Sequence, residues 1–291
     1  RALVIAGDCV ACHTAPGGQP FAGGLALQTP FGQIMAPNIT SDNTTGIGSW
    51  SADDFARAMQ EGRRPDGSHL YPAFPYPYYT KVERGDLDAI YAYLRTLPPV
   101  ENRVDRDTLP FPFNIRLLMK GWNTLFFTPG TFKPDPARSV EFNRGAYLVD
   151  GLGHCGACHT PFNAFGASKS EKYLEGNQIG NWTAPNITND ARVGLGKWSV
   201  DDIVQYLRNG QNGFSLASGP MKDVVENSTS KMPASDLKAI AVYLKERGAA
   251  GVPASTPLVA SDPRMQAGEA IYVDTCAACH MRSGEGVAHL F

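Results

Sequence analysis

The sequence has no long hydrophobic run and no excess of charge. No apolar stretch approaches the ~18–20 residues that a transmembrane helix needs, so no membrane span is predicted within it. Its 26 basic and 28 acidic residues leave a formal net charge of −2, which argues against a nucleic-acid partner, because proteins that bind nucleic acid normally carry a basic excess. Ser–His–Asp sets, phosphate-binding loops and dinucleotide fingerprints are also missing. These absences indicate that the chain is not an enzyme by itself.

No cysteine stands alone. The six cysteines form three C-x-x-C-H motifs, and this pentapeptide is the attachment signature of c-type haem. Two cysteines one helical turn apart can each form a thioether with a haem vinyl group, and the histidine that follows can reach the iron as its proximal ligand. The pattern predicts three covalently attached haems c. Their tethers and iron ligands are Cys9, Cys12 and His13; Cys155, Cys158 and His159; and Cys276, Cys279 and His280.

Zinc binding, disulfide bonding and thiol redox chemistry fit these cysteine pairs less well. Structural zinc sites usually join two C-x-x-C pairs within about 15–20 residues, whereas successive pairs here begin 146 and 121 residues apart. A disulfide framework suits a small secreted domain that lacks a core, and this chain of 291 residues is not such a domain. A thioredoxin-like redox pair needs a βαβ context, and none is found near the motifs. Covalent haem attachment is therefore the favoured interpretation.

Two stretches of the chain repeat each other. Ala36-Pro-Asn-Ile-Thr40 recurs as Ala184-Pro-Asn-Ile-Thr188, and each is followed by a Gly-x-Gly-x-Trp-Ser stretch. In both copies the serine stands three residues before an aspartate, which predicts a helix N-cap with a capping box. A glycine after the apolar pattern predicts the end of each helix. The expected helices cover residues 52–61 and 200–209, between Ser51 and Gly62 and between Ser199 and Gly210.

Further helices complete each copy. Leu87, Ile90, Tyr91 and Leu94 have the spacing of one helical face, and residues 236–245 repeat the pattern. Short helices are also expected at 144–149 and 268–272, before the second and third motifs. Since 30 glycines and 22 prolines indicate extensive loops, the sequence predicts an all-α fold. The expected architecture is a row of tandem class I-like cytochrome c domains with long loops.

The repeat suggests a division into five parts. The predicted parts are a first cytochrome c domain at 1–97, an insertion at 98–138, a second domain at 139–250, a linker at 251–263 and the start of a third domain at 264–291. In the first two domains, about 61–62 residues separate the motif histidine from the ligand loop. The chain ends at Phe291, well before that distance is reached from His280. The sequence is therefore expected to be part of a longer protein.

A second axial ligand is expected opposite each proximal histidine, and a methionine thioether there raises the reduction potential. In the second domain, Met221 lies in a predicted loop eleven residues after Gly210. Met232 is a weaker alternative, because it stands beside Pro233 at a helix start. Met221 is the predicted distal ligand of the second haem.

The first domain has Phe74 where its repeat has this methionine. Phenylalanine cannot bind iron, so this haem is either five-coordinate or bound by a residue from elsewhere. Met119 is the favoured candidate, because it lies in the insertion that only this domain carries, and His69 in the same loop as Phe74 is the alternative. Met35 and Met59 are interpreted as packing residues.

The insertion around Met119 is rich in Phe, Leu and Trp but is interrupted by Asn114, Arg116, Lys120 and Asn123. These polar residues exclude a spanning helix. A position at a membrane interface suits such a mixture of aromatic and cationic residues. A bridge between two haem domains is the favoured role.

The motifs together resemble a known family. The three C-x-x-C-H motifs, the two Ala-Pro-Asn-Ile-Thr repeats, and the loops Asp66-Gly-Ser-His-Leu-Tyr-Pro-Ala-Phe74 and Ser218-Gly-Pro-Met221 are similar to the tri-haem cytochrome c subunit of bacterial membrane-bound dehydrogenases. Those enzymes include quinoprotein alcohol dehydrogenase and the flavoprotein gluconate, sorbitol and fructose dehydrogenases, and similar subunits serve some molybdenum hydroxylases. The resemblance covers essentially the whole chain and departs at Phe74, where many members carry methionine.

The resemblance implies several properties. The protein would be periplasmic and attached to the outer face of the cytoplasmic membrane through a segment outside this sequence. Its partners would be a catalytic dehydrogenase subunit, which holds a flavin, quinone or molybdenum cofactor, and ubiquinone or a terminal oxidase, which receives the electrons.

The predicted function is therefore electron transfer by a multihaem c-type cytochrome subunit, with no catalytic residues of its own. One alternative is a haem enzyme or gas sensor, peroxidase-like, that uses an open face of the first haem beside Phe74. Another is a stand-alone soluble electron carrier. Rapid binding of carbon monoxide or peroxide at one haem would favour the enzyme or sensor, and co-purification with a large catalytic subunit would favour the subunit.

Overall fold

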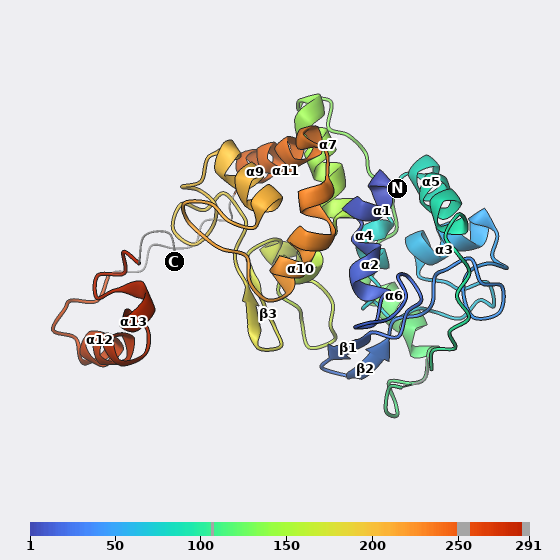
Figure 1. The fold of residues 1–291 in the computed structure, drawn as a ribbon, viewed down its shortest axis with the longest axis horizontal. Coiled ribbons are helices and arrows are strands. Elements are labelled where there is room, and N and C mark those ends of the chain that lie inside the picture. The colour runs from blue at the N-terminus through green and yellow to red at the C-terminus, as the bar shows by residue number, and fades with distance from the viewer. Residues whose placement is uncertain (106–107, 249–256, 287–291) are drawn as a thin grey trace. The chain divides into compact units, whose positions relative to one another are not determined.

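The computed structural model describes residues 1–105, 108–248 and 257–286. Contacts between residues divide the chain into two compact units, Arg1–Ala250 and Gly251–Phe291. Within the described residues the fold is mainly helical, with two short hairpins (Figure 1). No described helix is both long and apolar enough to cross a membrane.

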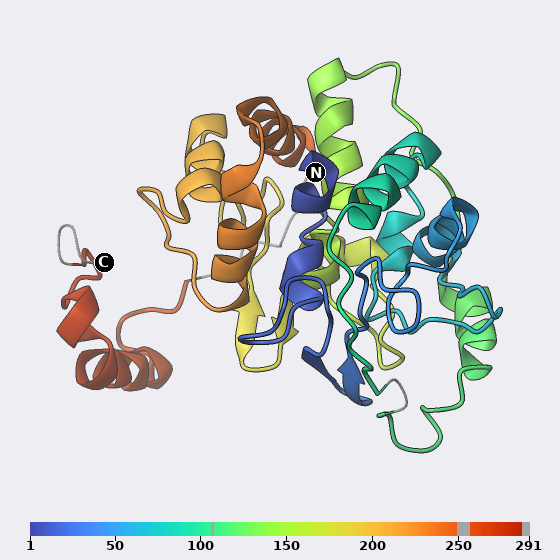
Figure 2. The same ribbon diagram turned by 45° about the vertical axis from the view of Figure 1, so that its right-hand side comes forward.

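The first unit contains two similar halves joined by one helix. The first half holds α1 (Ala2–Ala6), α2 (Cys9–Cys12), β1 (Ala26–Thr29), β2 (Gly32–Met35), α3 (Ala52–Glu61), α4 (Tyr76–Tyr79) and α5 (Arg84–Arg95). After α6 (Leu118–Phe126), the second half holds α7 (Val140–Tyr147), the π-helix η1 (Leu148–Leu152), α8 (Gly156–His159), the 3-10 helix η2 (Ser170–Lys172), β3 (Asn177–Ile179), β4 (Trp182–Ala184), α9 (Val200–Asn209), α10 (Pro220–Asn227), the 3-10 helix η3 (Thr229–Lys231) and α11 (Ala234–Glu246). Figure 2 shows α1 and α2 on the side of the first half that faces the second half.

The predicted helix ends of α3 and α9 are confirmed. The Ser51 side chain accepts a hydrogen bond from the backbone N–H of Asp54, whose carboxylate accepts one from the backbone of Ser51. Ser199 and Asp202 form the same capping box. Each such cap contributes about 1 kcal/mol to helix stability. The closing glycines adopt left-handed conformations, with φ of 63° at Gly62 and 75° at Gly210.

The repeated Asn-Ile-Thr has a structural role in each half. The Asn38 side-chain oxygen accepts a hydrogen bond from the backbone N–H of Thr40 at 2.9 Å, and Asn186 accepts one from Thr188 at 2.8 Å. These Asx-type turns reverse the chain just after each hairpin. They therefore fix the position of the proline that precedes each asparagine.

The hairpins themselves were not predicted. Strands β1 and β2 pair antiparallel, as do β3 and β4, in places where the sequence indicated only loops. Strands of three or four residues are too short to show a clear alternating pattern. The fold is therefore helical with two small hairpins, not purely α.

Helices α5 and α11 bury their predicted apolar faces. Leu87, Ile90 and Leu94 are each no more than 1% exposed. In the second half α7 packs against α11, as Figure 1 shows. A methyl group built on Gly145 of α7 would lie 2.0 Å from the Ala239 carbonyl oxygen of α11, so only glycine permits this close approach of the two helices.

The insertion contacts both halves through α6. The Tyr76 hydroxyl donates a hydrogen bond to the Asn123 side chain at 2.6 Å, and the Trp122 indole N–H donates to the Phe165 carbonyl at 2.9 Å. These contacts agree with the bridging role that the sequence suggested. The same segment leaves large apolar side chains exposed, notably Leu117 and Leu125.

The second unit holds α12 (Pro263–Thr275) and α13 (Ala277–His280). The Asp262 side chain caps α12 by accepting a hydrogen bond from the backbone of Arg264. The helix predicted at 268–272 forms part of the second half of α12. The predicted linker at 251–263 lies partly outside the described residues.

Candidate functional site: the C-x-x-C-H motifs and the first cleft

All three C-x-x-C-H motifs fold as one helical turn. In each, the backbone N–H of the histidine donates to the carbonyl of the first cysteine, at 3.1 Å for His13, 3.0 Å for His159 and 2.9 Å for His280. All six thiols are free of disulfide bonds. The turn brings both cysteines and the histidine to one side, as covalent haem attachment requires.

The thiols of Cys9 and Cys155 lack the lowered pKa of a redox-active cysteine. Burial raises the pKa of the Cys9 thiol to about 12 and that of Cys155 to about 12. Catalytic and redox cysteines have lowered pKa values instead. The structure therefore argues against a thioredoxin-like role for these pairs.

The first two motif histidines are held in the same way. The imidazole Nδ1–H of His13 donates to the Pro37 carbonyl oxygen at 2.7 Å, and that of His159 donates to the Pro185 carbonyl at 2.7 Å. Because a carbonyl only accepts, Nδ1 carries the proton and Nε2 keeps a free lone pair. Burial also lowers the pKa of both imidazoles, which favours the neutral form that binds a metal.

Asp8, beside the first motif, is an unusual acid. Its backbone is left-handed, with a φ of 48°, and its Oδ1 atom is buried without a hydrogen-bond partner. Burial, followed by the negative charge of Asp223, raises the pKa of its carboxyl group to about 7. A neutral carboxyl there avoids a buried negative charge beside the cleft.

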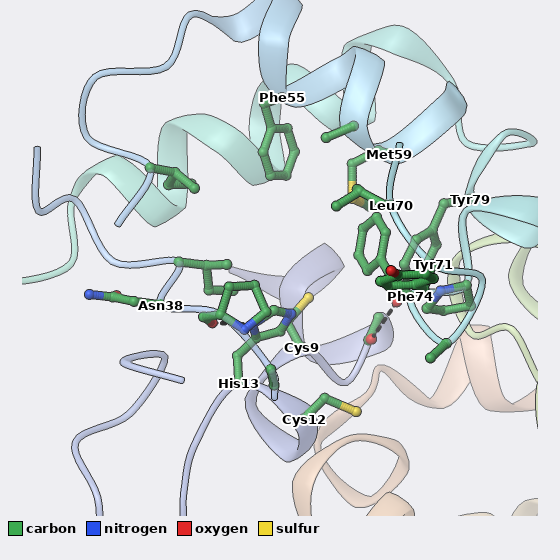
Figure 3. Close-up of a pocket in the computed structure, with 18 of the residues that line it drawn as sticks. Cys9, Cys12, His13, Asn38, Phe55, Met59, Leu70, Tyr71, Phe74 and Tyr79 are labelled. Atoms are coloured by element: carbon green, nitrogen blue, oxygen red, sulfur yellow. Dashed lines mark hydrogen bonds between the residues drawn. The ribbon is translucent and has the colours of Figure 1, made fainter. Parts of the chain in front are cut away.

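A deep cleft opens in front of the first motif (Figure 3). The empty space within it, open mouth included, is about 1380 Å³. Cys9, Cys12 and His13 form one wall, and Phe55 and Met59 of α3 lie on another (Figure 3). Apolar side chains from further segments complete the lining: Leu27, Ile34, Met35, Ile39, Ile47, Trp50, Leu70, Phe74, Ile90 and Leu94.

A haem fits this donor set and this lining. The two thiols can form the thioethers, the His13 Nε2 can bind iron, and the apolar walls suit a porphyrin. When bound, haem c supplies one-electron transfer. The chain's own contribution is to orient the imidazole through Pro37, to tether the group and to exclude water.

Two lining residues come from outside the first half. Arg116 belongs to the insertion, and His154 immediately precedes the second motif. The half-buried His154 ring packs edge-on against Tyr79, with the ring centroids 5.3 Å apart, and its left-handed backbone has a φ of 38°. The second motif also lies close to the first half, because Gly156 of α8 lies against the Tyr78 ring of α4.

The second motif is surrounded by a polar network. The Asp150 carboxylate accepts hydrogen bonds from the hydroxyls of Tyr173 at 2.7 Å and Tyr243 at 2.8 Å. Gly156 lies against Tyr173 and Tyr78, so closely that a methyl group there would clash with both rings. This network fixes α8 in place in the second half.

The cysteines of the third motif are as exposed as those of the first two, with Cys276 half-buried and Cys279 exposed. His280 is exposed, whereas His13 and His159 are half-buried. The Tyr272 hydroxyl donates to the Met281 carbonyl at 2.8 Å and so ties α12 to the chain after the motif. Outside residues 106–107, 249–256 and 287–291, no group of three His, Cys, Asp or Glu residues has the arrangement of a metal site.

The predicted distal ligands occupy different surroundings. Met221 is half-buried in the first turn of α10, which begins where the sequence indicated a loop. Met232 is 4% exposed and belongs to the hydrophobic core. Met119 lies half-buried in α6 and is not among the residues that line the first cleft. Its role as an iron ligand stays a prediction, as does that of Met221.

The structure also shows where the other candidate residues of the first half lie. His69 is buried, with an Nδ1 atom that has no hydrogen-bond partner, and it does not line the cleft. Phe74 does line it and packs on Tyr79. Met35 and Met59, interpreted as packing residues, are part of the lining.

The sequence did not indicate that Asp8, Arg116 and His154 would lie at the cleft. No local pattern distinguishes them, since two come from segments far along the chain and are brought there only by packing. The one indirect signal in the sequence was for Arg116, because the insertion that carries it occurs in the first half alone.

Comparisons with known proteins agree with this site. The cytochrome c family model matches residues 1–98. One of the subunits of nicotinate dehydrogenase from Pseudomonas putida is 44% identical over 96% of this chain and 24% of its own length. The gluconate 2-dehydrogenase cytochrome c subunit of Pantoea cypripedii is 43% identical over 99% of this chain and 69% of its own. A dihaem c-type cytochrome of Cereibacter sphaeroides is 42% identical over 82% of both.

The chain thus spans about a quarter of the first of these relatives, and about two thirds of the second. Cytochrome subunits of fructose dehydrogenase and of quinone-type alcohol dehydrogenase match as well. A cytochrome c domain implies covalently attached haem, in agreement with the motif at Cys9. This chain belongs to the family of c-type cytochromes that includes the cytochrome c subunit of gluconate 2-dehydrogenase.

Proposed function

We propose that this chain is a multihaem c-type cytochrome that carries electrons away from a catalytic dehydrogenase subunit and is not itself the catalyst. The observation that carries the proposal is the matched pair of histidines in one compact unit. His13 and His159 each donate to a proline carbonyl at 2.7 Å, and His154, the residue before the second motif, lines the cleft of the first. Haems attached at two motifs this close would exchange electrons directly.

We also propose that the chain carries three haems, whereas the comparisons support a cytochrome c domain without giving the number of haems. The tethers are the six cysteines, and the proximal ligands are His13, His159 and His280. The turn closed by His280 has the same backbone hydrogen bond as the other two. The proposed class I-like domains lie at 1–97 and 139–250, with the insertion at 98–138, the linker at 251–263 and the start of a third domain at 264–291.

The proposed partner follows from the relatives' names. Relatives are cytochrome subunits of gluconate, fructose and quinone-type alcohol dehydrogenases, and one is a subunit of nicotinate dehydrogenase. We infer a partner with a flavin, quinone or molybdenum cofactor, a periplasmic location at the membrane, and ubiquinone or a terminal oxidase as acceptor. The exposed Leu117 and Leu125 of the insertion suit a protein partner.

Anaerobic stopped-flow reduction tests this function. The large subunit that co-purifies with the chain is mixed with the haem-loaded chain and the substrate of that subunit. We expect the haem absorbance to show full reduction, at an amplitude that corresponds to three haems, and no reduction by substrate when the large subunit is left out. Substrate oxidation by the isolated chain, or rapid binding of carbon monoxide at the first haem, would instead favour the haem-enzyme alternative.

Axial ligation is tested with a matched pair of methionine variants. If Met221 and Met119 bind the second and first irons, each alanine variant should lose the sulfur-ligation absorption band of one haem and become five-coordinate there. Met232→Ala is the control, because Met232 is a core residue and its loss should affect stability without changing the band. An unchanged spectrum in Met119→Ala would show that Met119 does not bind the first iron. That iron would then be bound by His69 or be five-coordinate.

A further inference from the structure

Two arginines line the first cleft. Arg64 comes from the loop after α3, and Arg116 comes from the insertion. Among the described residues that line this cleft, they are the only arginines or lysines. The walls around them are mainly apolar, so a negative group bound there would be poorly hydrated and strongly attracted to a cation.

Arg116 is held at the cleft by the loop that leads to Phe74. One of its terminal N–H groups donates to the His69 carbonyl at 3.2 Å, and its guanidinium lies 4.7 Å from the centroid of the Tyr71 ring. Together the two contacts hold the planar guanidinium group in a defined orientation. The insertion therefore supplies a positioned cation, whereas its exposed neighbour Lys120 does not line the cleft.

The second half lacks this arrangement. The backbone N–H of Arg64 donates to Ser68 at 2.9 Å, and at the equivalent place that of Asn212 donates to Ser215 at 3.0 Å. The neutral Asn212 side chain instead donates to the Asp202 carbonyl. The insertion that supplies Arg116 has no counterpart in the second half, and Asn212 stands where the first half has Arg64.

We propose that Arg116 binds a carboxylate of the group in the first cleft, namely a propionate of the haem tethered by Cys9 and Cys12, and so raises the reduction potential of that haem. The inference rests on the proposed haem attachment. A guanidinium matches a carboxylate in a bidentate manner, and a nearby positive charge favours the iron state that has gained an electron.

Redox titration of the full haem-loaded chain tests this proposal, with the first haem resolved by its spectrum. Arg116→Gln should lower the potential of the first haem by roughly 60 mV, a tenfold change in the equilibrium constant of reduction, and leave the second unchanged. Arg116→Lys keeps the positive charge but loses the planar guanidinium. It should therefore lower the potential of the first haem by less than Arg116→Gln does. This second variant also gives a result if the glutamine variant folds poorly.

Lys120→Gln is the matched control, because it removes the same charge four residues along the chain from an exposed position. It should leave the first potential unchanged. Equal shifts in the Lys120 and Arg116 variants, or no shift in Arg116→Gln, would overturn the proposal while haem remains attached. Peptide mass analysis shows whether Cys9 and Cys12 carry a haem. If they carry one, the potentials test the role of Arg116; if they carry none, it is the proposed function that fails.

Discussion

Replacing Cys9 and Cys12 by alanine is expected to remove one haem and to destabilise the Arg1–Ala250 unit by more than about 5 kcal/mol. The cleft in front of these cysteines has mainly apolar walls, and it would be left open to water without its occupant. Truncating a single large core side chain already costs about 2–5 kcal/mol, and a porphyrin is larger than any side chain. Intact mass and thermal unfolding measure the two effects.

The double variant Cys276→Ala/Cys279→Ala is the control. It should also lose the mass of one haem, but the melting transition of the first unit should not move, because the third motif belongs to the other compact unit. An equal loss of stability in both double variants would contradict the assignment of the first cleft as a haem site. An unchanged mass in either variant would show that its motif carries no haem.

Replacing Gly145 by alanine is expected to destabilise the second half by about 2 kcal/mol or more, the usual cost of overpacking. The added methyl group would lie 2.0 Å from the Ala239 carbonyl oxygen and 2.6 Å from the Tyr243 Cβ. Helices α7 and α11 would have to separate, and the Tyr243 bond to Asp150 beside the second motif would be strained. Denaturant unfolding of the haem-loaded protein, followed by circular dichroism, measures the change.

Gly121→Ala provides the comparison for Gly145, since both glycines lie inside helices. Nothing lies within 4 Å of a methyl group built on Gly121 in α6. Alanine is favoured over glycine in a helix by about 0.5–1 kcal/mol, so this variant should be neutral or slightly more stable. A Gly145 variant as stable as the Gly121 variant would show that α7 and α11 are not in backbone contact.

Local features of this protein follow directly from its sequence. The capping boxes at Ser51 and Ser199 and the left-handed glycines that end α3 and α9 depend on side chains within a few residues of each other. The C-x-x-C-H turns are equally local, because one helical turn brings both cysteines and the histidine together. The repeat and the family resemblance extend the same short-range patterns along the chain, and the cytochrome c family is confirmed.

Features that depend on long-range packing were not predicted. The hairpins at β1–β2 and β3–β4 are too short to leave a periodic signal, and the helix at Met221 replaces an expected loop. His154 and Arg116 enter the first cleft from segments that are distant in sequence.

The sequence by itself determined that this protein has three C-x-x-C-H motifs, two repeated helical halves and a charge balance unsuited to nucleic acid. Only the tertiary structure decided which side chains surround the first motif and that its walls come from three parts of the chain. The physical reason is that tethering depends on chemistry within five consecutive residues, whereas the environment of a buried group depends on every segment that packs against it.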